Sequence, residues 1–221
     1  WRQPLSSISA ISATLSLDIM LNNYNEEFFK NRLDAIDELA QHLSHTIDDF
    51  RGFFQEKTEK KSVKVSELVR NCLTIIEPSL KNHNINLDIE INESLEVESY
   101  ANELKQVMLN IFKNAEDALL DLNIQSATIS ARSYQKNSNV YIEIEDNAGG
   151  IAKDIIDKIF DPYFSTKKQK DGTGLGLYMS RIIMQEHIGG KILVKNSNEG
   201  ACFSLVIPVK NDDTTLEGEK A

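Results

Sequence analysis

The chain of 221 residues is 41% hydrophobic and 26% charged, which is typical of a soluble globular protein with one or two domains. Its net charge of −10 argues against a surface for nucleic acid or for an anionic membrane. No window approaches the roughly 18 consecutive apolar residues that a membrane-spanning helix needs. Two cysteines, Cys72 and Cys202, suit a reducing compartment, and we expect both to be buried as small apolar residues.

The first predicted elements are two helices that form an antiparallel hairpin. Apolar residues recur at helical spacing from Leu5 to about Leu21, and the turn-forming residues Asn22–Asn25 end this first helix. In the second helix, apolar residues alternate spacings of four and three, as in a heptad seam. The seam consists of Phe29, Leu33, Ile36, Ala40, Leu43, Ile47, Phe50 and Phe54. A hairpin cannot bury such a stripe alone, so we expect a homodimer that forms a four-helix bundle. The alternative is a hairpin packed against its own domain.

The hydrophobic period changes after the charged run Glu56–Ser62, which predicts a hinge between domains, the alternative being a frayed helix end. The predicted domains are the hairpin (1–60), a second domain (61–210) and a disordered polar tail (211–221). The predicted strands are residues 63–65, 86–91, 95–98, 127–134, 140–145, 191–195 and 202–207, and the later predicted helices are 66–82, 102–120 and 174–187. The expected fold class is α+β: a helical hairpin followed by an α/β sandwich, in which three helices cover one face of a mixed sheet.

Glycine-rich motifs dominate the stretch from Asp146 to Leu177. It opens with D-N-A-G-G-I, passes F-D-P-Y-F-S-T-K and closes with D-G-T-G-L-G-L. Glycine allows positive φ and lets backbone amides approach an anion without a Cβ in the way. The helix expected to begin near Gly174 would point its unpaired N–H groups at the same anion. These features predict a polyphosphate ligand.

An asparagine pair precedes these motifs. Asn110 and Asn114 are four residues apart in a predicted helix and therefore share one face. Apolar residues, Val107, Met108 and Ile111, surround the pair, so the two amides need polar partners. A Mg²⁺ ion with its waters and phosphates would supply them.

The motifs N-x-x-x-N, D-x-A-G-G, F-D-P-Y-F and G-T-G-L-G-L, in this order, resemble the ATP-binding domain of sensor histidine kinases, which has the GHKL-type Bergerat fold. The resemblance implies a protein-histidine kinase core that uses ATP and Mg²⁺. It would phosphorylate a histidine and relay the phosphate to an aspartate in the receiver domain of a response regulator. The alternative is an ATP-binding dimeric scaffold, or a phosphatase-type regulator, without kinase activity.

The resemblance also assigns roles to single residues. Asp146 matches the aspartate that accepts a hydrogen bond from the adenine amino group, although Ala148 replaces the usual first glycine of this motif. Asn114 matches the Mg²⁺ ligand, and Asn110 supports the same metal and phosphate cluster. The remaining positions assigned to the ATP site are Lys113, Asp117, Gly150, Ile151, Phe160, Phe164, Thr166, Lys167, Lys168, Gly172, Thr173, Gly174, Leu175, Gly176 and Leu177.

Many family members carry a basic residue at the position of Asp117. We expect the charge on the phosphates to come instead from Lys167 and Lys168 in the lid, with Lys167 as a catalytic candidate; the alternative is two solvated surface lysines. Lys113 points a different way on the helix from Asn114. Gyrase-like and chaperone ATPases of this fold place a glutamate base at the position of Asn110. An amide cannot take a proton, so we expect transfer to a protein side chain rather than hydrolysis.

The first residues, W-R-Q-P-L, resemble the end of the family's phosphoacceptor motif, His-x-x-Arg-x-Pro-Leu. By this spacing the phosphorylated histidine lies two positions before Trp1, so we expect a cytoplasmic fragment that cannot autophosphorylate, with any sensory or membrane part upstream. Gln3 stands where many relatives hold the Thr or Asn that orients a hydrolytic water, the alternative being a helix-surface glutamine. We expect the four histidines, His42, His45, His83 and His187, to lie on helix surfaces or in loops.

Overall fold

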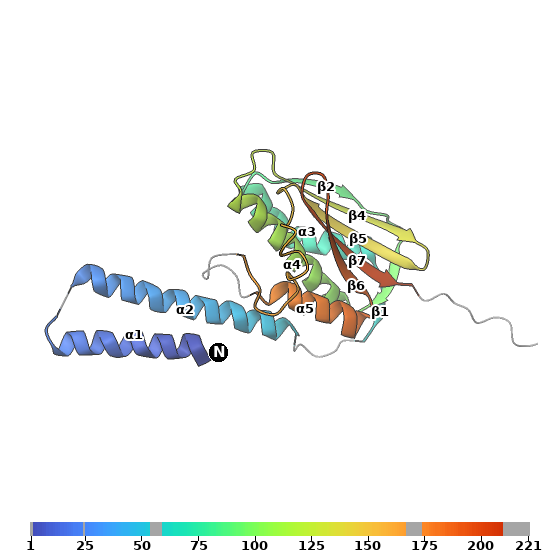
Figure 1. The fold of residues 1–221 in the computed structure, drawn as a ribbon. Coiled ribbons are helices and arrows are strands. Elements are labelled where there is room, and N and C mark those ends of the chain that lie inside the picture. The colour runs from blue at the N-terminus through green and yellow to red at the C-terminus, as the bar shows by residue number, and fades with distance from the viewer. Residues whose placement is uncertain (1, 24, 54–58, 167–173, 210–221) are drawn as a thin grey trace, which may run out of the picture. The chain divides into compact units, whose positions relative to one another are not determined.

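The computed structural model describes residues 2–23, 25–53, 59–166 and 174–209 (Figure 1). The chain forms two compact units, one made of Trp1–Gln55 with Ile159–Gly176 and the other of Glu56–Lys158 with Leu177–Ala221. The domain limits expected from the sequence stay a prediction, and the predicted tail, 211–221, lies outside the described residues. None of the described helices combines the length and apolarity that crossing a bilayer requires.

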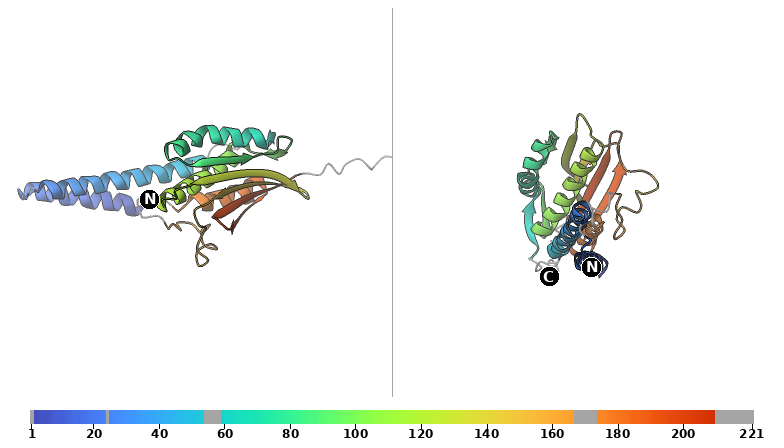
Figure 2. Two further views of the ribbon diagram at one scale, coloured as in Figure 1. Left: turned by 90° about the horizontal axis from the view of Figure 1, so that it is seen from above. Right: turned by 90° about the vertical axis from the view of Figure 1, so that its left-hand side faces the viewer.

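The first unit contains the predicted helical hairpin. Helices α1 (Arg2–Met20) and α2 (Glu26–Phe53) run antiparallel, side by side (Figures 1 and 2). The turn forms where the sequence predicts it, because Asn22 adopts the left-handed φ of 52° that asparagine tolerates. The side chain of Asn25 then accepts a hydrogen bond of 2.9 Å from the amide of Phe28, which caps α2.

Many apolar side chains of the hairpin are exposed. Leu15 is buried, but Leu17, Ile19 and Leu33 are each more than half exposed, at 56%, 61% and 56%. A hairpin of two helices has too little interior to cover a stripe of this width. Within the described residues of the first unit, part of the predicted apolar seam is therefore left in contact with solvent.

The second unit is built on a mixed sheet, as predicted. Of the described strands, five lie in the order β2-β4-β5-β7-β6. Their bounds are β2 (Asn86–Glu90), β4 (Thr128–Lys136), β5 (Asn139–Asp146), β7 (Ala201–Pro208) and β6 (Lys191–Asn196). Strand β2 pairs parallel with β4, and the other pairs are antiparallel.

Two predicted strands do not join this sheet. Strands β1 (Lys61–Lys64) and β3 (Glu96–Ser99) pair antiparallel with each other in a two-stranded sheet of their own. The sequence predicts both strands but no separate sheet for them, because alternation indicates a strand but not its partner. The prediction also extended the first strand to Val65, whereas the structure begins the next helix there.

Three helical segments lie on one face of the five-stranded sheet (Figures 1 and 2). They are α3 (Val65–Asn82), α4 (Ala101–Asp121) and α5 (Gly176–Ile182), the last continued by the π-helix η1 (Ile183–Ile188). The core lies between these layers: Ile142 and Ile144 of β5 and Leu205 of β7 are almost fully buried. The predicted arrangement of helices on one face of a mixed sheet is confirmed.

The cysteines behave as the sequence predicts. Cys72 and Cys202 are both free and buried. Burial raises the pKa of the Cys72 thiol to about 12 and also raises that of Cys202 above its ordinary value. Both side chains are therefore protonated at neutral pH and act as small apolar residues.

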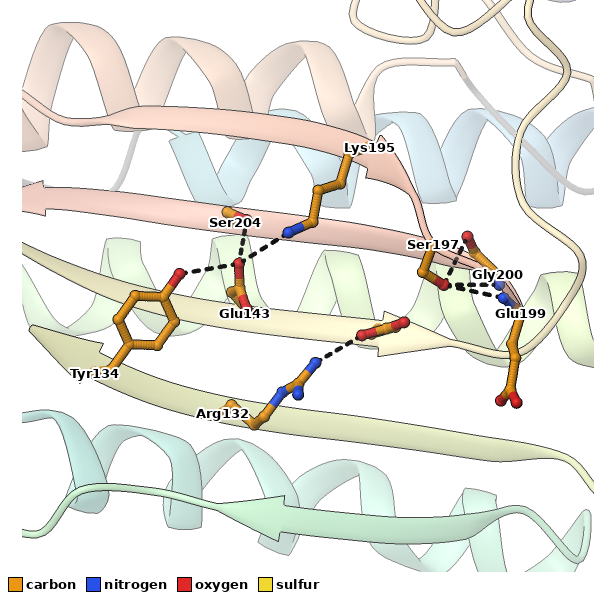
Figure 3. A network of polar contacts seen from close by, with 9 residues as sticks. Arg132, Tyr134, Glu143, Lys195, Ser197, Glu199, Gly200 and Ser204 are labelled. Carbon is orange, nitrogen blue, oxygen red and sulfur yellow. Dashed lines mark hydrogen bonds and ion pairs between the residues drawn. The ribbon is translucent and has the colours of Figure 1, made fainter. Parts of the chain in front are cut away.

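The opposite face of the sheet carries a polar network (Figure 3). A carboxylate oxygen of Glu143 accepts hydrogen bonds from Tyr134 at 3.2 Å and Ser204 at 3.1 Å, and lies 3.6 Å from the ammonium of Lys195. These residues come from β4, β5, β7 and β6. Because cross-strand pairs hold neighbouring strands in register, this network fixes the alignment of the four strands.

Candidate functional site

Asp146 ends β5, the central strand, and its side chain is only 6% exposed. One carboxylate oxygen, Oδ1, accepts hydrogen bonds from the amides of Ala148 at 2.9 Å and Ala201 at 3.2 Å. Burial raises the pKa of Asp146 above its ordinary value, and the two amides oppose this effect. The second oxygen, Oδ2, takes neither of these two bonds and can accept one from a bound group.

A tight glycine turn follows Asp146. Gly149 and Gly150 have φ of 78° and 84°, in the left-handed region that favours glycine. A Cβ on Gly150 would lie 2.8 Å from Oδ1 of Asn196, so Asn196 would have to shift, and the positive φ strains any other residue at this position. Ala148 is not among the described non-glycine residues with positive φ, which explains why alanine fits at the family's usual first glycine. Ile151 follows the turn, and its backbone is paired with Asn196.

The asparagine pair lies on α4. Both Asn110 and Asn114 are half-buried. The amide nitrogen of Asn110 donates a hydrogen bond of 2.9 Å to the hydroxyl of Ser180 on α5, and Ser180 is only 3% exposed. Ser180 is not among the site residues predicted from the sequence. A single small polar residue on the apolar face of α5, between Met179 and Ile183, was the available signal.

Lys113 forms ion pairs with two carboxylates on its own helix. Its ammonium lies 2.9 Å from Glu116 and 3.0 Å from Asp117. Burial lowers the pKa of Lys113, but hydrogen bonds to the two carboxylates outweigh this effect and raise the pKa above its ordinary value. Lys113 therefore remains charged, and its charge is balanced within α4. Asp117, at the position where many relatives carry a basic residue, is one of the groups that balance it.

Glu116 is the buried centre of a polar cluster and is not among the site residues predicted from the sequence. Its fully buried carboxylate accepts hydrogen bonds from Ser79 at 2.5 Å and Lys113 at 2.9 Å, and lies 2.9 Å from the ring of His83. Burial acts to raise the pKa of Glu116, but these hydrogen bonds outweigh it and hold the pKa below the ordinary value. Ser79 belongs to α3 and His83 follows it directly. The cluster therefore ties α3 to the helix of the asparagine pair.

The F-D-P-Y-F motif belongs to the first unit, where it contacts the second glycine motif. The amide of Tyr163 donates a hydrogen bond of 2.9 Å to the carbonyl of Gly174. Gly174 has a φ of 66°, and a Cβ there would lie 2.5 Å from the backbone of Tyr163. Phe160 is buried, Phe164 is half-buried and Thr166 is exposed.

The remaining predicted site residues differ in how the structure describes them. Leu175 is buried, Gly176 begins α5 and Leu177 is half-buried. Lys167, Lys168, Gly172 and Thr173 lie outside the described residues. Gln3 lies in α1, and its side chain is likewise not described.

The histidines supply no metal centre within the described residues, where no three His, Cys, Asp or Glu side chains are grouped to hold a metal ion. His83 lies beside Glu116, and His187 lies 2.9 Å from Glu103. His42 and His45 lie in α2, and their side chains are not described. A Mg²⁺ ion fits the half-buried asparagine pair, because this ion keeps several waters and needs only one or two oxygen ligands from the protein.

Comparison with known proteins places these features in a family. The model of the histidine kinase-, DNA gyrase B-, and HSP90-like ATPase family matches residues 99–211. Sensor histidine kinase ZraS of Salmonella typhimurium is 30% identical over 94% of this chain and 43% of its own length. Sporulation kinase C of Bacillus subtilis is 25% identical over 96% of this chain and 47% of its own length. The chain thus spans less than half the length of these curated relatives.

Solved structures agree with this placement. The catalytic domain of histidine kinase ThkA is 32% identical, with a TM-score of 0.61 over 68% of this chain and 96% of that domain. A structure of ThkA in complex with the response regulator TrrA has a TM-score of 0.68 over 95% of this chain and 59% of the ThkA chain. Its identity of 24% makes this second likeness one of fold.

Proposed function

Because the chain belongs to the family of histidine kinase-, DNA gyrase B- and HSP90-like ATPases, as the catalytic core of a sensor histidine kinase, we propose that it binds ATP with Mg²⁺ and phosphorylates a histidine. The phosphate then passes to an aspartate of a response-regulator receiver domain. One observation carries the proposal: the buried carboxylate of Asp146 ends a central strand and is followed directly by the Gly149–Gly150 turn.

Asp146 holds the adenine ring. A buried, ionised acceptor discriminates strongly for a donor, because a mismatched group would leave the carboxylate unpaired. Hydrogen bonds from Ala148 and Ala201 already fix its Oδ1, so Oδ2 stands ready to accept the adenine amino group. The turn at Gly149 and Gly150 lets the backbone pass close to the ligand without a Cβ.

Asn114 supplies an amide oxygen to Mg²⁺, and Asn110, held by Ser180, supports the same cluster. The ion neutralises charge on the phosphates when it is bound. Lys167, Lys168 and the lid aromatics Phe160 and Phe164 complete the predicted phosphate side of the site. Asn110 offers no base to activate water, so the bound nucleotide is kept for transfer to a histidine.

The acceptor histidine belongs two positions before Trp1, as the resemblance of W-R-Q-P-L to the phosphoacceptor motif indicates. Gln3, four positions after it, takes part in removing phosphate from the regulator. The ThkA–TrrA complex supports a receiver domain as the partner. The exposed apolar residues of α1 and α2 support a homodimer through a four-helix bundle. Because the reaction consumes ATP, we place it in the cytoplasm.

Calorimetry with a non-hydrolysable ATP analogue and Mg²⁺ tests nucleotide binding. The chain should bind the analogue, and Asp146→Ala or Asn114→Ala should abolish binding. Asp88→Ala, which removes an exposed carboxylate on β2, is the matched control and should bind as the original chain does. Unchanged affinity in both site variants would place the nucleotide elsewhere.

Phosphate incorporation tests the kinase step. The chain extended by its native upstream residues should become labelled on a histidine, with an acid-labile and base-stable product, whereas the present chain should not. If the extended chain binds the nucleotide but takes up no phosphate, the protein is instead an ATP-binding dimeric scaffold or a phosphatase-type regulator. Label on His42 or His45 would contradict the assignment of the acceptor.

A further inference from the structure

We infer that the connection between β6 and β7 holds the Asp146 segment in place through Asn196, Gly200 and Ala201, and that Asn196 is a positioning residue for nucleotide binding. The sequence predicts a hairpin turn here, in N-S-N-E-G, but none of the ATP-site motifs includes it. It lies far along the chain from Asp146 but contacts the segment that begins there. The inference rests on the proposed nucleotide binding and adds to it a structural support for adenine recognition.

Asn196 pairs with the backbone of Ile151 in both directions. The amide of Ile151 donates to Oδ1 of Asn196 at 2.8 Å, and the side-chain nitrogen of Asn196 donates to the carbonyl of Ile151 at 2.7 Å. Ile151 directly follows Gly149 and Gly150, whose backbones have the widest conformational freedom. A paired anchor at the end of the glycine turn removes much of that freedom.

A second contact joins the connection between β6 and β7 to the glycine turn through Gly149. The amide of Gly149 donates a hydrogen bond of 2.8 Å to the carbonyl of Glu199. The hydroxyl of Ser197 accepts hydrogen bonds from the amides of Glu199 at 3.3 Å and Gly200 at 3.0 Å, which fixes the shape of the turn (Figure 3). The carbonyl of Glu199 is thereby held in place for Gly149.

The end of the turn contacts Asp146 itself. A Cβ on Gly200 would lie 1.9 Å from the carbonyl oxygen of Asp146, so only glycine allows this close approach. The next amide, that of Ala201, donates to Oδ1 of Asp146 at 3.2 Å. The connection between β6 and β7 thus contacts both the carboxylate of Asp146, which is proposed to bind adenine, and the glycine turn that follows it.

Asn196 is the residue on which to test this role. Its side chain is exposed, so its removal leaves no cavity and no buried unpaired group in the core. A change at Asn196 should therefore act on the position of the Asp146 segment and leave the fold of the second unit intact. Gly200 is less suitable, because a side chain there would collide with the backbone.

Three variants of the full chain separate the possibilities in calorimetry with Mg²⁺ and a non-hydrolysable ATP analogue. Asn196→Ala should weaken binding about three- to tenfold, as expected for the loss of a pair of hydrogen bonds. Asn196→Asp keeps the size of the side chain but loses the donor to Ile151, and should weaken binding similarly. Asn198→Ala, which removes an exposed asparagine from the same turn, should leave the affinity unchanged.

Displacement of the bound analogue by GTP gives the second readout. Guanine carries an acceptor where adenine carries the amino group that Asp146 reads. Displacing Asp146 should therefore weaken ATP binding more than GTP binding, and the preference for ATP should fall in Asn196→Ala. The midpoint of thermal unfolding without nucleotide should stay close to that of the original chain.

The outcomes keep the two proposals apart. An original chain that does not bind the ATP analogue overturns the proposed function before any variant is compared. Binding by the original chain, with Asn196→Ala indistinguishable from Asn198→Ala, overturns the inference alone. An equal loss of ATP and GTP binding, together with a lower unfolding midpoint, also overturns it, because general loosening would then explain the loss.

Discussion

The buried carboxylate of Asp146 destabilises the folded protein when it is ionised. This carboxylate is buried at the end of β5, and its pKa is raised mainly by burial, despite the amides of Ala148 and Ala201. A raised pKa means that the folded state favours the protonated form. The charge that the proposed recognition of the nucleotide requires therefore opposes folding at neutral pH.

The destabilising charge leads to a prediction for the stability of the Asp146→Asn variant without nucleotide. A raised pKa contributes stability that is present below the ordinary value of 3.8 and is lost as the pH rises through the folded value. The neutral amide should therefore make the variant as stable as the original chain or more stable at about pH 7, while nucleotide binding is lost. The difference in unfolding free energy should shrink as the pH falls through the raised folded pKa, and it should vanish below the ordinary value of 3.8.

Thermal unfolding of the second unit at the two pH values measures this. Asp88→Asn, an exposed change on β2, is the control and should follow the original chain at both. A variant at Asp146 that is less stable at neutral pH and equal in acid would show that the carboxylate stabilises the fold instead.

At the scale of elements, the position of α4 depends on its neighbours. Glu116 ties it to α3 through Ser79, and Asn110 ties it to α5 through Ser180. Lys113 completes the Glu116 cluster on α4. These contacts fix the position and rotation of α4, and the proposed metal ligand Asn114 depends on both.

Glu116→Gln should loosen the contact between α3 and α4. The amide is isosteric, but it loses charge-assisted bonds to Ser79 and Lys113, so the unfolding free energy should fall by about 1–3 kcal/mol at neutral pH. The pKa of Glu116 is lowered, so this contribution is present above the ordinary value of 4.5 and is lost as the pH falls through the lower folded value.

Denaturant unfolding at neutral pH and near pH 3 tests both parts of this prediction. Asp121→Asn, at the exposed end of α4, provides the matched control. If Glu116→Gln is as stable as the control variant at neutral pH, the cluster does not hold the two helices together.

At the scale of the whole molecule, the hairpin leaves apolar side chains in solvent. Leu17 and Leu33 are each 56% exposed and Ile19 is 61% exposed. Leu33 belongs to the heptad seam that the sequence predicts. Exposed apolar residues on both helices favour a partner surface, and a second copy of the hairpin presents the same residues.

Leu33→Asp should therefore dissociate a dimer of the chain. The residue is exposed within one chain, so the change costs little in the monomer, but in a dimer it would bury an unpaired charge. Light scattering should report a dimer for the original chain and for the exposed control variant Asn31→Asp, and a monomer for Leu33→Asp. A monomeric original chain would contradict the four-helix bundle.

The local structure and the family follow from the sequence alone. Helical periodicity alone predicts the apolar seam in 29–54. The residues Asn22–Asn25 alone predict the turn between the two helices. The glycine turn is likewise predictable from local sequence, because glycine is the residue that readily adopts the positive φ found at Gly149 and Gly150. The order of the motifs then identified the family, which the match to residues 99–211 confirmed.

The distant residues that support the candidate site are brought to it by the packing of the folded chain. Ser180 meets Asn110 across 70 residues, Asn196 meets Ile151 across 45, and Ser79 meets Glu116 across 37. Strand β1 likewise found its partner in β3 and not in the main sheet. Neighbouring residues in the sequence do not reveal such partners, because the packing of the helices and the sheet determines which residues meet. Periodicity shows which face of an element is buried, and packing alone decides what that face meets.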